Sequence, residues 1–499
     1  MEILANLSLG FSTAFSLANL FFCFVGVVLG TLVGVLPGLG PVATIAMLLP
    51  ITYSFEPVTA LIMLAGIFYG AQYGGSTTAI LVNLPGEASS VITALDGYAM
   101  ARKGQAGKAL AVAAIGSFIA GTIATFLIAL AAPPLAALAM QFGPAEYFSL
   151  LVMGLIVSIV LAHGSLLHAI GMILLGLLLG IIGSDVNSGA ERFTFGQPWL
   201  ADGIGFVVLA MGMYGIGEII NNLEKHETRD VMTKSVTGLR LSWAEFKGIL
   251  PSILRGTGVG SFLGILPGGG AVLSSFAAYA VEKKLSKNPI PFGQGAIEGV
   301  AGPESANNAG AQTSFIPMLT LGIPSNPTMA IMIGAMMIHS IQPGPAVLTE
   351  QPALFWGLIV SMWIGNLFLI VLNLPMIGIW VKLITAPYHL MYPVILVFCA
   401  IGVMSISNTE WDVFLMAFFG VVGYVFNKLE CEPAPMLLGF ILGPMMEEYL
   451  RRALLMSKGD FSVFLTRPIS ATLLALAVVA LIVVLLPTIS KKREETFKE

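Results

Sequence analysis

Long apolar runs without a charged side chain dominate the chain. Residues 3–55, 305–349 and 468–490 contain no Asp, Glu, Lys or Arg, and each run exceeds the roughly 20 apolar residues that cross a bilayer as a helix. The pattern predicts an all-α polytopic membrane protein with about 11–13 transmembrane segments. The candidate segments lie near residues 14–36, 56–84, 108–131, 144–162, 165–183, 203–221, 249–266, 311–344, 353–374, 388–407, 411–428, 434–447 and 469–489.

Two parts of the chain resemble each other. The segment Leu29–Gly40, LGTLVGVLPGLG, matches Val259–Gly270, VGSFLGILPGGG, with every Gly and Pro of the first aligned on a Gly or Pro of the second. A second pair follows at a slightly larger shift, because Gly75–Gly86 resembles Thr313–Ser325. Both members of that pair are hydroxyl-rich, then apolar, then contain a proline. Internal repeats of this kind are typical of secondary transporters.

The basic residues indicate how the two repeats are oriented. Short loops on the cytoplasmic side of a membrane are enriched in Lys and Arg. In the first half, loop 50–57 has no basic residue and the stretch 102–108 has three, whereas in the second half the stretch 283–287 has three and 312–351 has none. Equivalent loops then lie on opposite sides, which predicts two inverted repeats with broken helices or re-entrant hairpins. Arg451 and Arg452 do not fit, because this topology places them outside.

The polar stretches divide the chain into four expected regions. They are a first transmembrane repeat (1–221), a polar cytoplasmic linker (222–247), a second transmembrane repeat (248–450), and a C-terminal region (451–499) with an amphipathic linker, an extra transmembrane helix and a basic tail.

A Pro-Gly cluster interrupts an apolar segment in each half. Proline removes a backbone donor and glycine tolerates unusual dihedral angles, so each cluster predicts a broken helix. Broken backbone at membrane depth has to be buried in protein or line a wet cavity, where half-helix N-termini suit anions and free carbonyls suit cations. Tight helix packing is the alternative, since both segments also contain a GxxxG motif. The expected substrate-binding residues here are Gly38, Gly40, Gly268, Gly269 and Gly270. Those expected to bind a coupling cation are Pro37, Thr44, Pro267 and Ser274.

Uncharged polar residues accompany the second pair of repeated segments. Such side chains can donate hydrogen bonds to a carboxylate, although interhelical hydrogen bonding explains each one equally well. The expected substrate-binding residues are Ser76, Thr77, Thr78, Asn83, Pro85, Asn307, Asn308, Gln312, Thr313, Ser314 and Pro324. Glu304 lies beside this group and is the best ionisable candidate for the coupling cation. A solvated loop is the alternative environment for this carboxylate.

The composition of the chain argues against several classes of function. The chain is 57% hydrophobic and 10% charged, against about 25% charged residues in soluble domains. Its formal net charge of −4 argues against a nucleic-acid partner. The sequence has no Walker phosphate loop, no H-E-x-x-H motif and no C-x-x-C spacing among its three cysteines. We therefore expect no enzymatic activity, no metal site and no cofactor beyond a co-transported ion.

The sequence resembles the large membrane subunit of the tripartite tricarboxylate transporters, the TctA family. The matching blocks cover residues 30–50, 73–110, 264–270 and 302–345, and include GTLVGVLPGLG, YGGSTTAILVNLPGE, GILPGGG and GPESANNAGAQTSF. The resemblance implies a bacterial inner-membrane subunit that works with a small TctB-like membrane subunit and a periplasmic TctC-like solute-binding protein. It also implies uptake of tricarboxylates or related organic anions, driven by a sodium or proton gradient. An organic-anion channel and a stand-alone secondary carrier are the alternative functions.

Overall fold

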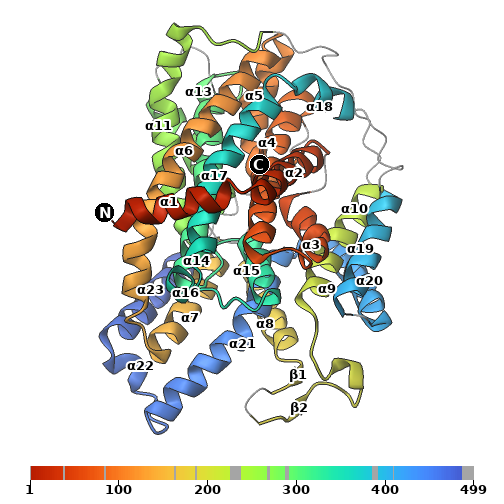
Figure 1. Cartoon of the computed structure of the whole chain (residues 1–499), viewed down its shortest axis with the longest axis vertical. Coiled ribbons are helices and arrows are strands. Elements are labelled where there is room, and N and C mark those ends of the chain that lie inside the picture. Colours follow the sequence, from red (N-terminus) through yellow and green to blue (C-terminus); the bar gives the residue numbers. More distant parts are fainter. Residues whose placement is uncertain are drawn as a thin grey trace.

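The computed structural model describes residues 2–36, 40–83, 86–161, 165–185, 188–224, 238–266, 270–286, 292–384, 392–407 and 409–485. These ranges are almost entirely helical (Figure 1), which confirms an all-α polytopic membrane protein. The first half contains α1 (Glu2–Ala14), α2 (Leu17–Gly34), α3 (Pro41–Thr52), α4 (Pro57–Val82), η1 (Ala88–Ser90), α5 (Val91–Arg102), α6 (Ala106–Ala139), α7 (Pro144–Leu161) and α8 (Leu166–Gly180). A small antiparallel pair, β1 (Gly183–Ser184) and β2 (Glu191–Arg192), follows, and then η2 (Pro198–Leu200), α9 (Phe206–Ala210), the π-helical η3 (Met211–Ile216) and α10 (Gly217–Glu224).

The second half repeats the helical character. It contains α11 (Trp243–Ile265), α12 (Gly270–Leu285), α13 (Glu298–Thr313), α14 (Phe315–Leu321), α15 (Pro327–Ile338), α16 (Ala346–Glu350), α17 (Pro352–Asn373) and α18 (Ile377–Ile384). The last helices are α19 (Tyr392–Ser407), α20 (Glu410–Lys428), α21 (Pro433–Met456), α22 (Val463–Thr466) and α23 (Pro468–Leu485).

Proline and capping residues mark many of the helix starts. Proline occupies the first turn of α3, α4, α15, α17 and α21, where its missing N–H has no intrahelical acceptor to lose. Ser242 and Glu245 form a reciprocal capping box at the start of α11, which satisfies two otherwise free donors. Helix α11 therefore begins at Trp243, inside the stretch expected to be a polar linker.

Glycines bring α2 and α4 into backbone contact. A Cβ atom on any of three glycines of α2 would lie 2.2 Å from a carbonyl oxygen of α4, far closer than a carbon and an oxygen can approach. Glycine is required there because only its missing side chain lets the two main chains meet. The contacts pair Gly26 with Met63, Gly30 with Ile67 and Gly34 with Ala71.

The same contacts recur between α11 and α13 in the second half. A Cβ on Gly256, Gly260 or Gly264 would lie 2.2, 2.3 or 2.4 Å from a carbonyl oxygen of α13. The partners are Gly302, Ala306 and Gly310, at the same spacing of four residues. The repeated Gly-rich segments thus form equivalent helix pairs, as the packing alternative predicts. The inverted relation of the two halves stays a prediction.

Helices α6 and α17 lie between these two pairs (Figure 1). They contact each other, and α6 packs on α11 and α13 while α17 packs on α2 and α4. Helix α4 is 94% buried over its most apolar window, and the residues of α13 from Gly299 to Thr313 are all buried. The helices that carry most of the candidate polar residues therefore form the centre of the molecule.

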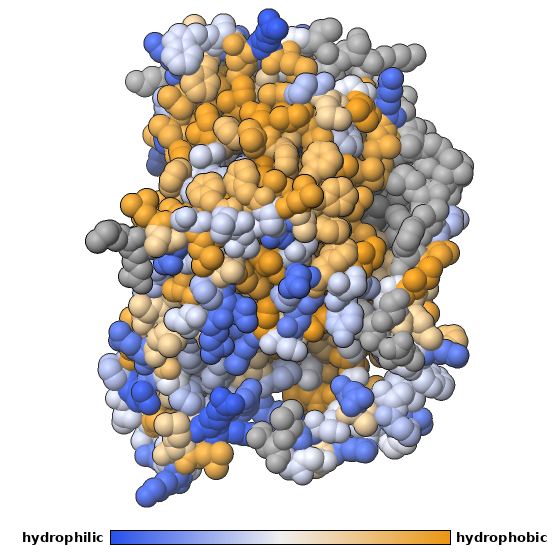
Figure 2. Space-filling view, in the orientation of Figure 1, coloured by the Kyte–Doolittle hydropathy of each residue, from blue (hydrophilic) through white to orange (hydrophobic). Residues whose placement is uncertain are grey.

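Five helices of the described chain are long and apolar enough to cross a membrane: α2, α4, α6, α17 and α20. Shorter apolar helices accompany them, so the total of 11–13 crossings stays a prediction. In Figure 2, apolar side chains gather over the upper part of the face, where α2, α6 and α17 lie, and hydrophilic ones gather toward the lower end.

One sequence-based boundary was wrong. The apolar segment 311–344 is not one span, because α13, α14 and α15 follow one another with breaks at Ser314 and 322–326. Helix α13 begins at Glu298 and is buried although it is not apolar. Its Glu, Ser, Asn and Gln side chains lower its hydropathy, and so the apolar pattern did not show this helix.

Candidate functional site

The predicted Pro-Gly breaks are only partly visible. Six predicted site residues lie outside the described residues: Pro37, Gly38, Pro85, Pro267, Gly268 and Gly269. The described flanks show that α2 ends at Gly34 and α3 begins at Pro41, while α11 ends at Ile265 and α12 begins at Gly270. Each predicted break therefore separates two helices.

In the first half, the backbone that follows α4 lies against the end of α2. Helix α4 ends at Val82, and its C-cap residue Asn83 has a left-handed φ of 57°. The Gly86 N–H then donates to the Gly75 carbonyl at 3.4 Å. A Cβ on Gly86 would lie 2.4 Å from the Gly34 oxygen, so this backbone touches the end of α2.

The second half repeats this arrangement with different side chains. Helix α14 ends at Leu321, and its C-cap residue Gly322 has a φ of 71°. Ser325 Oγ donates to the Ser314 carbonyl at 3.2 Å. Asn326 caps α15 by accepting from the Met329 N–H at 3.0 Å. A Cβ on Gly270 would lie 3.2 Å from Asn326 Nδ2. The N-termini of α12 and α15 are therefore neighbours.

Glu304 joins the two halves of the chain. Its side chain is 2% exposed on α13, and its Oε1 accepts a 2.9 Å hydrogen bond from Ser76 Oγ on α4. The Thr93 hydroxyl on α5 donates to the same oxygen, and Ser117 on α6 donates to the Glu304 carbonyl at 3.1 Å. A solvated loop environment for this carboxylate was the wrong alternative.

A second carboxylate, Glu87, lies beside this group and was missed from the sequence. Asn307 Nδ2, one helical turn after Glu304, donates to Glu87 Oε1 at 3.3 Å, and the Ser89 hydroxyl donates to the same oxygen. Glu87 and Glu304 are close enough to interact electrostatically. Within the described residues, neither carboxylate pairs with a Lys, Arg or His. The position of Glu87 directly after Pro85-Gly86 was the signal available in the sequence.

An amide cluster continues along the same face of α13. Asn308 Nδ2 donates to the Ser117 carbonyl and, at 3.2 Å, to Asn366 Oδ1 on α17, while Thr125 Oγ1 donates to Gln312 Oε1 at 2.5 Å. Gly121 of α6 faces the cluster, since a Cβ there would lie 2.6–2.8 Å from three amide nitrogens. Asn366 was also missed, because a single Asn in an apolar helix gives little signal.

Several predicted hydroxyls donate within their own helix. Each hydroxyl donates its proton to the backbone carbonyl three or four residues earlier, and so only its oxygen lone pairs remain for a ligand. These residues are Thr44, Thr77, Thr78, Ser274, Thr313 and Ser314. In this arrangement they suit a cation better than an anion.

Buried oxygens without a hydrogen-bond partner surround the carboxylates. Gln72 Oε1 and Asn307 Oδ1 belong to side chains that are 3% and 2% exposed, and neither has a hydrogen-bond partner among the residues that the structure describes. An unsatisfied buried polar atom costs about 1–3 kcal/mol. Carboxylate, amide and hydroxyl oxygens together make a set that suits a hard cation.

A buried polar centre between paired helices with breaks is typical of multi-pass membrane transporters. A family model described as the tripartite tricarboxylate transporter TctA family matches residues 20–438. The chain belongs to this family.

Two relatives from Agrobacterium vitis are similar along their lengths. An uncharacterized 52.8 kDa protein in the TAR-I ttuC' 3' region is 60% identical over 499 residues, which cover 100% of this chain and 99% of the relative. An uncharacterized protein in the TAR-II ttuC' 3' region is 61% identical over 240 residues, 48% of this chain and 99% of the relative. No solved structure matches the chain.

Proposed function

We propose that this chain is the translocation subunit of a tripartite secondary transporter that takes up an organic carboxylate together with Na⁺ or H⁺. Family membership supports a transporter subunit rather than an enzyme. In the proposed assembly, a periplasmic binding protein delivers the anion, and a small second subunit accompanies this chain in the bacterial inner membrane. Tricarboxylates are the first substrates to test because the family is described by them.

The observation that carries the proposal is the pair Glu87 and Glu304. Glu304 is buried and the neighbouring Glu87 is partly buried, and neither has a cationic partner in the described chain. This arrangement is unfavourable, because burial removes the water that stabilises their charge. A bound Na⁺ or proton would reduce the charge of the pair from −2 to −1 and so lower the cost of burying it. The oxygens of Ser76, Thr93 and Asn307 lie around the same group, and so the proposed cation site draws on both halves.

The proposed anion site lies at the second-half breaks. The start of α12 at Gly270 adjoins Asn326, the N-cap of α15. Helix N-termini carry partial positive charge and free N–H groups, and both favour a carboxylate. Asn326 adds an uncharged amide, whereas the corresponding cap in the first half is Glu87. The anion would thus bind at the breaks of the second half, and the cation would bind at Glu87 and Glu304.

Transport assays with all three proteins test the proposal. We would reconstitute this chain with its small subunit in liposomes, add the binding protein outside, and follow labelled citrate and related carboxylates. Saturable uptake and counterflow that require a Na⁺ or pH gradient are expected. Passive, non-saturating flux would instead indicate the organic-anion channel, and uptake without either partner would indicate a stand-alone carrier.

A further inference from the structure

The end of α21 lies where the chain leaves the apolar region and returns to it. The helix is free of charged residues from Pro433 to Met446 and then carries Glu447, Glu448, Arg451 and Arg452. The apolar helix α23 begins at Pro468. Residues 447–467 therefore belong at the membrane surface, and in Figure 1 they form the lower end of the molecule around α22.

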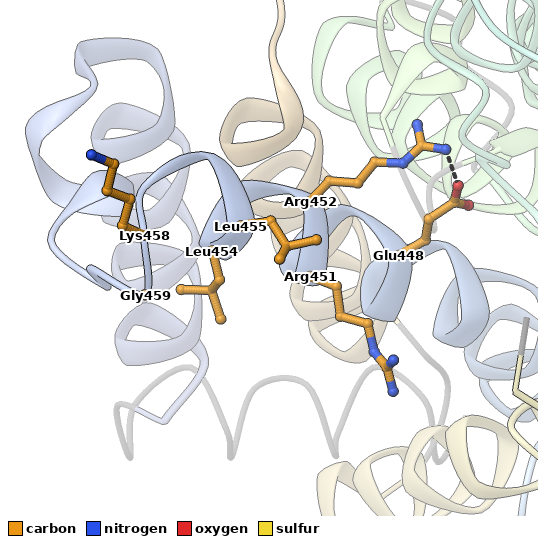
Figure 3. Close-up of a pocket in the computed structure, with 7 residues that line it drawn as sticks. All are labelled: Glu448, Arg451, Arg452, Leu454, Leu455, Lys458 and Gly459. Atoms are coloured by element: carbon orange, nitrogen blue, oxygen red, sulfur yellow. Dashed lines mark ion pairs between the residues drawn. The ribbon is translucent and has the colours of Figure 1, made fainter. Parts of the chain in front are cut away.

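A pocket of about 520 Å³ lies in this region. Figure 3 shows two leucines between the arginines on one side and the lysine on the other. The residues that line the pocket are Glu448, Arg451, Arg452, Leu454, Leu455, Lys458 and Gly459. Three cationic side chains and one carboxylate give the lining a net positive charge.

The three cationic side chains differ in the ion pairs that they form. Arg451 bonds Asp185 at 3.0 Å and Glu447 at 2.6 Å, and Arg452 pairs with Glu448. In the described chain no carboxylate pairs with the Lys458 ammonium, which is exposed. Lys458 is thus available to an anionic ligand, and so are the guanidinium nitrogens of Arg452 that do not contact Glu448.

Exposed apolar side chains occur along the same segment of the chain. Leu455 is 79% exposed and Met456 is 71% exposed, and Phe461 and Leu465 on the way to α23 are 64% and 72% exposed. Large apolar side chains beside Lys and Arg are typical of a segment that rests in the headgroup region of a bilayer.

We propose that this pocket binds the headgroup of an anionic phospholipid. The headgroup would occupy the pocket, with Arg452 on one side and Lys458 on the other (Figure 3), and the acyl chains would cover Leu454 and Leu455 and run along the apolar surface toward α23. Charge complementarity favours an anionic lipid, and the leucine wall favours a lipid over a free anion. The ligand chemistry differs from that of the buried transport site, which contains carboxylates.

Native mass spectrometry of the purified full chain tests this site. Detergent-solubilised protein would be titrated with phosphatidylglycerol or phosphatidylcholine, and the bound lipids counted. Each cation near a phosphate contributes about 1 kcal/mol, so Arg452→Gln/Lys458→Asn is expected to weaken phosphatidylglycerol binding about 30-fold. Lys458→Asn alone should weaken it about fivefold, and Asn tolerates the left-handed φ of 56° at this position.

The matched control removes two exposed cations elsewhere. Lys283→Gln/Lys284→Gln on α12 should leave phosphatidylglycerol binding unchanged. Equal binding of the two lipids, or unchanged affinity in Arg452→Gln/Lys458→Asn, would overturn the proposal. Displacement of the lipid by an equal concentration of sn-glycerol 3-phosphate would also overturn it, because the site would then recognise a free phosphate.

Discussion

Ser76 on α4 donates a 2.9 Å hydrogen bond to the carboxylate of Glu304 on α13, although the two residues come from different halves of the chain. Both side chains are at most 3% exposed. A movement that separates α4 from α13 has to break this bond and leave a buried carboxylate with one donor fewer. The charge state of Glu304 and the contact between the halves are therefore linked.

Replacing Glu304 tests the proposed cation site. Glu304→Gln keeps the shape and one acceptor oxygen for Ser76 and Thr93 but removes the charge. Contacts to a charged group contribute about 1.5–3 kcal/mol, so the cation concentration for half-maximal uptake should rise at least about tenfold. Uptake measured against Na⁺ concentration and against pH would also identify the coupling ion.

Glu245→Gln provides the control for that change. Glu245 is a partly exposed carboxylate at the start of α11, 2.6 Å from Lys108, and Gln retains the capping interaction. Its cation dependence should stay within about twofold of the natural chain, since exposed pairs contribute about 0–1 kcal/mol. An unchanged cation response in Glu304→Gln would remove Glu304 from the proposed site.

Asn326 tests the proposed anion site. Asp and Ser both cap a helix as Asn does, and so Asn326→Asp and Asn326→Ser should fold alike. The Asp variant places a negative charge beside the starts of α12 and α15, and carboxylate uptake should fall at least about tenfold. The Ser variant should retain most uptake. Equal uptake by the two variants at saturating and limiting substrate would contradict an anion at this position.

Helix α11 offers matched glycines for a stability test. A Cβ on Gly260 would meet the Ala306 carbonyl at 2.3 Å, whereas Gly258 has no atom within 4 Å of that position. Gly260→Ala should destabilise the chain by about 2 kcal/mol or more because a main chain has to move. Gly258→Ala should be neutral or stabilising by up to about 1 kcal/mol. Size-exclusion profiles after heating report both, and equal losses would refute the close-contact interpretation.

Cysteine labelling tests the inversion of the repeats. In a background without Cys23, Cys399 and Cys431, Ser54→Cys and Lys284→Cys each place one exposed thiol in a loop or helix end of opposite predicted side. An impermeant maleimide added to intact cells should label Ser54→Cys, and Lys284→Cys only after permeabilisation. Labelling of both from the same side would refute inverted topology.

The sequence predicted the helices best where apolar runs are uninterrupted, as in α2, α6 and α17. It failed at α13, whose Glu, Ser, Asn and Gln residues look polar although the helix is buried. A hydropathy pattern records affinity for lipid, but α13 contacts protein on every side. The repeat was visible because close backbone contact requires glycine at fixed positions.

The candidate site was predictable only in part. Glu304 stood out as an acidic residue beside a charge-free run, and the structure buries it between the halves. Glu87 and Asn366 did not stand out, because each contacts a segment distant in the sequence. The same holds for Asp96 of α5, which accepts from the Gly295 and Ala296 N–H groups at 2.7 and 2.8 Å. Such pairings depend on the tertiary fold, which local spacing does not specify.

The glycine contacts also constrain how the protein can change shape. Where two main chains touch at glycines, no side chain lies between them that could change its rotamer. We therefore expect α2 with α4, and α11 with α13, to move as rigid units. Accordingly, we expect deformation during a transport cycle at the hydrogen-bonded junction of the two helix pairs and in the short segments between helices. Inhibitors that wedge into that junction would stop the cycle without resembling the substrate.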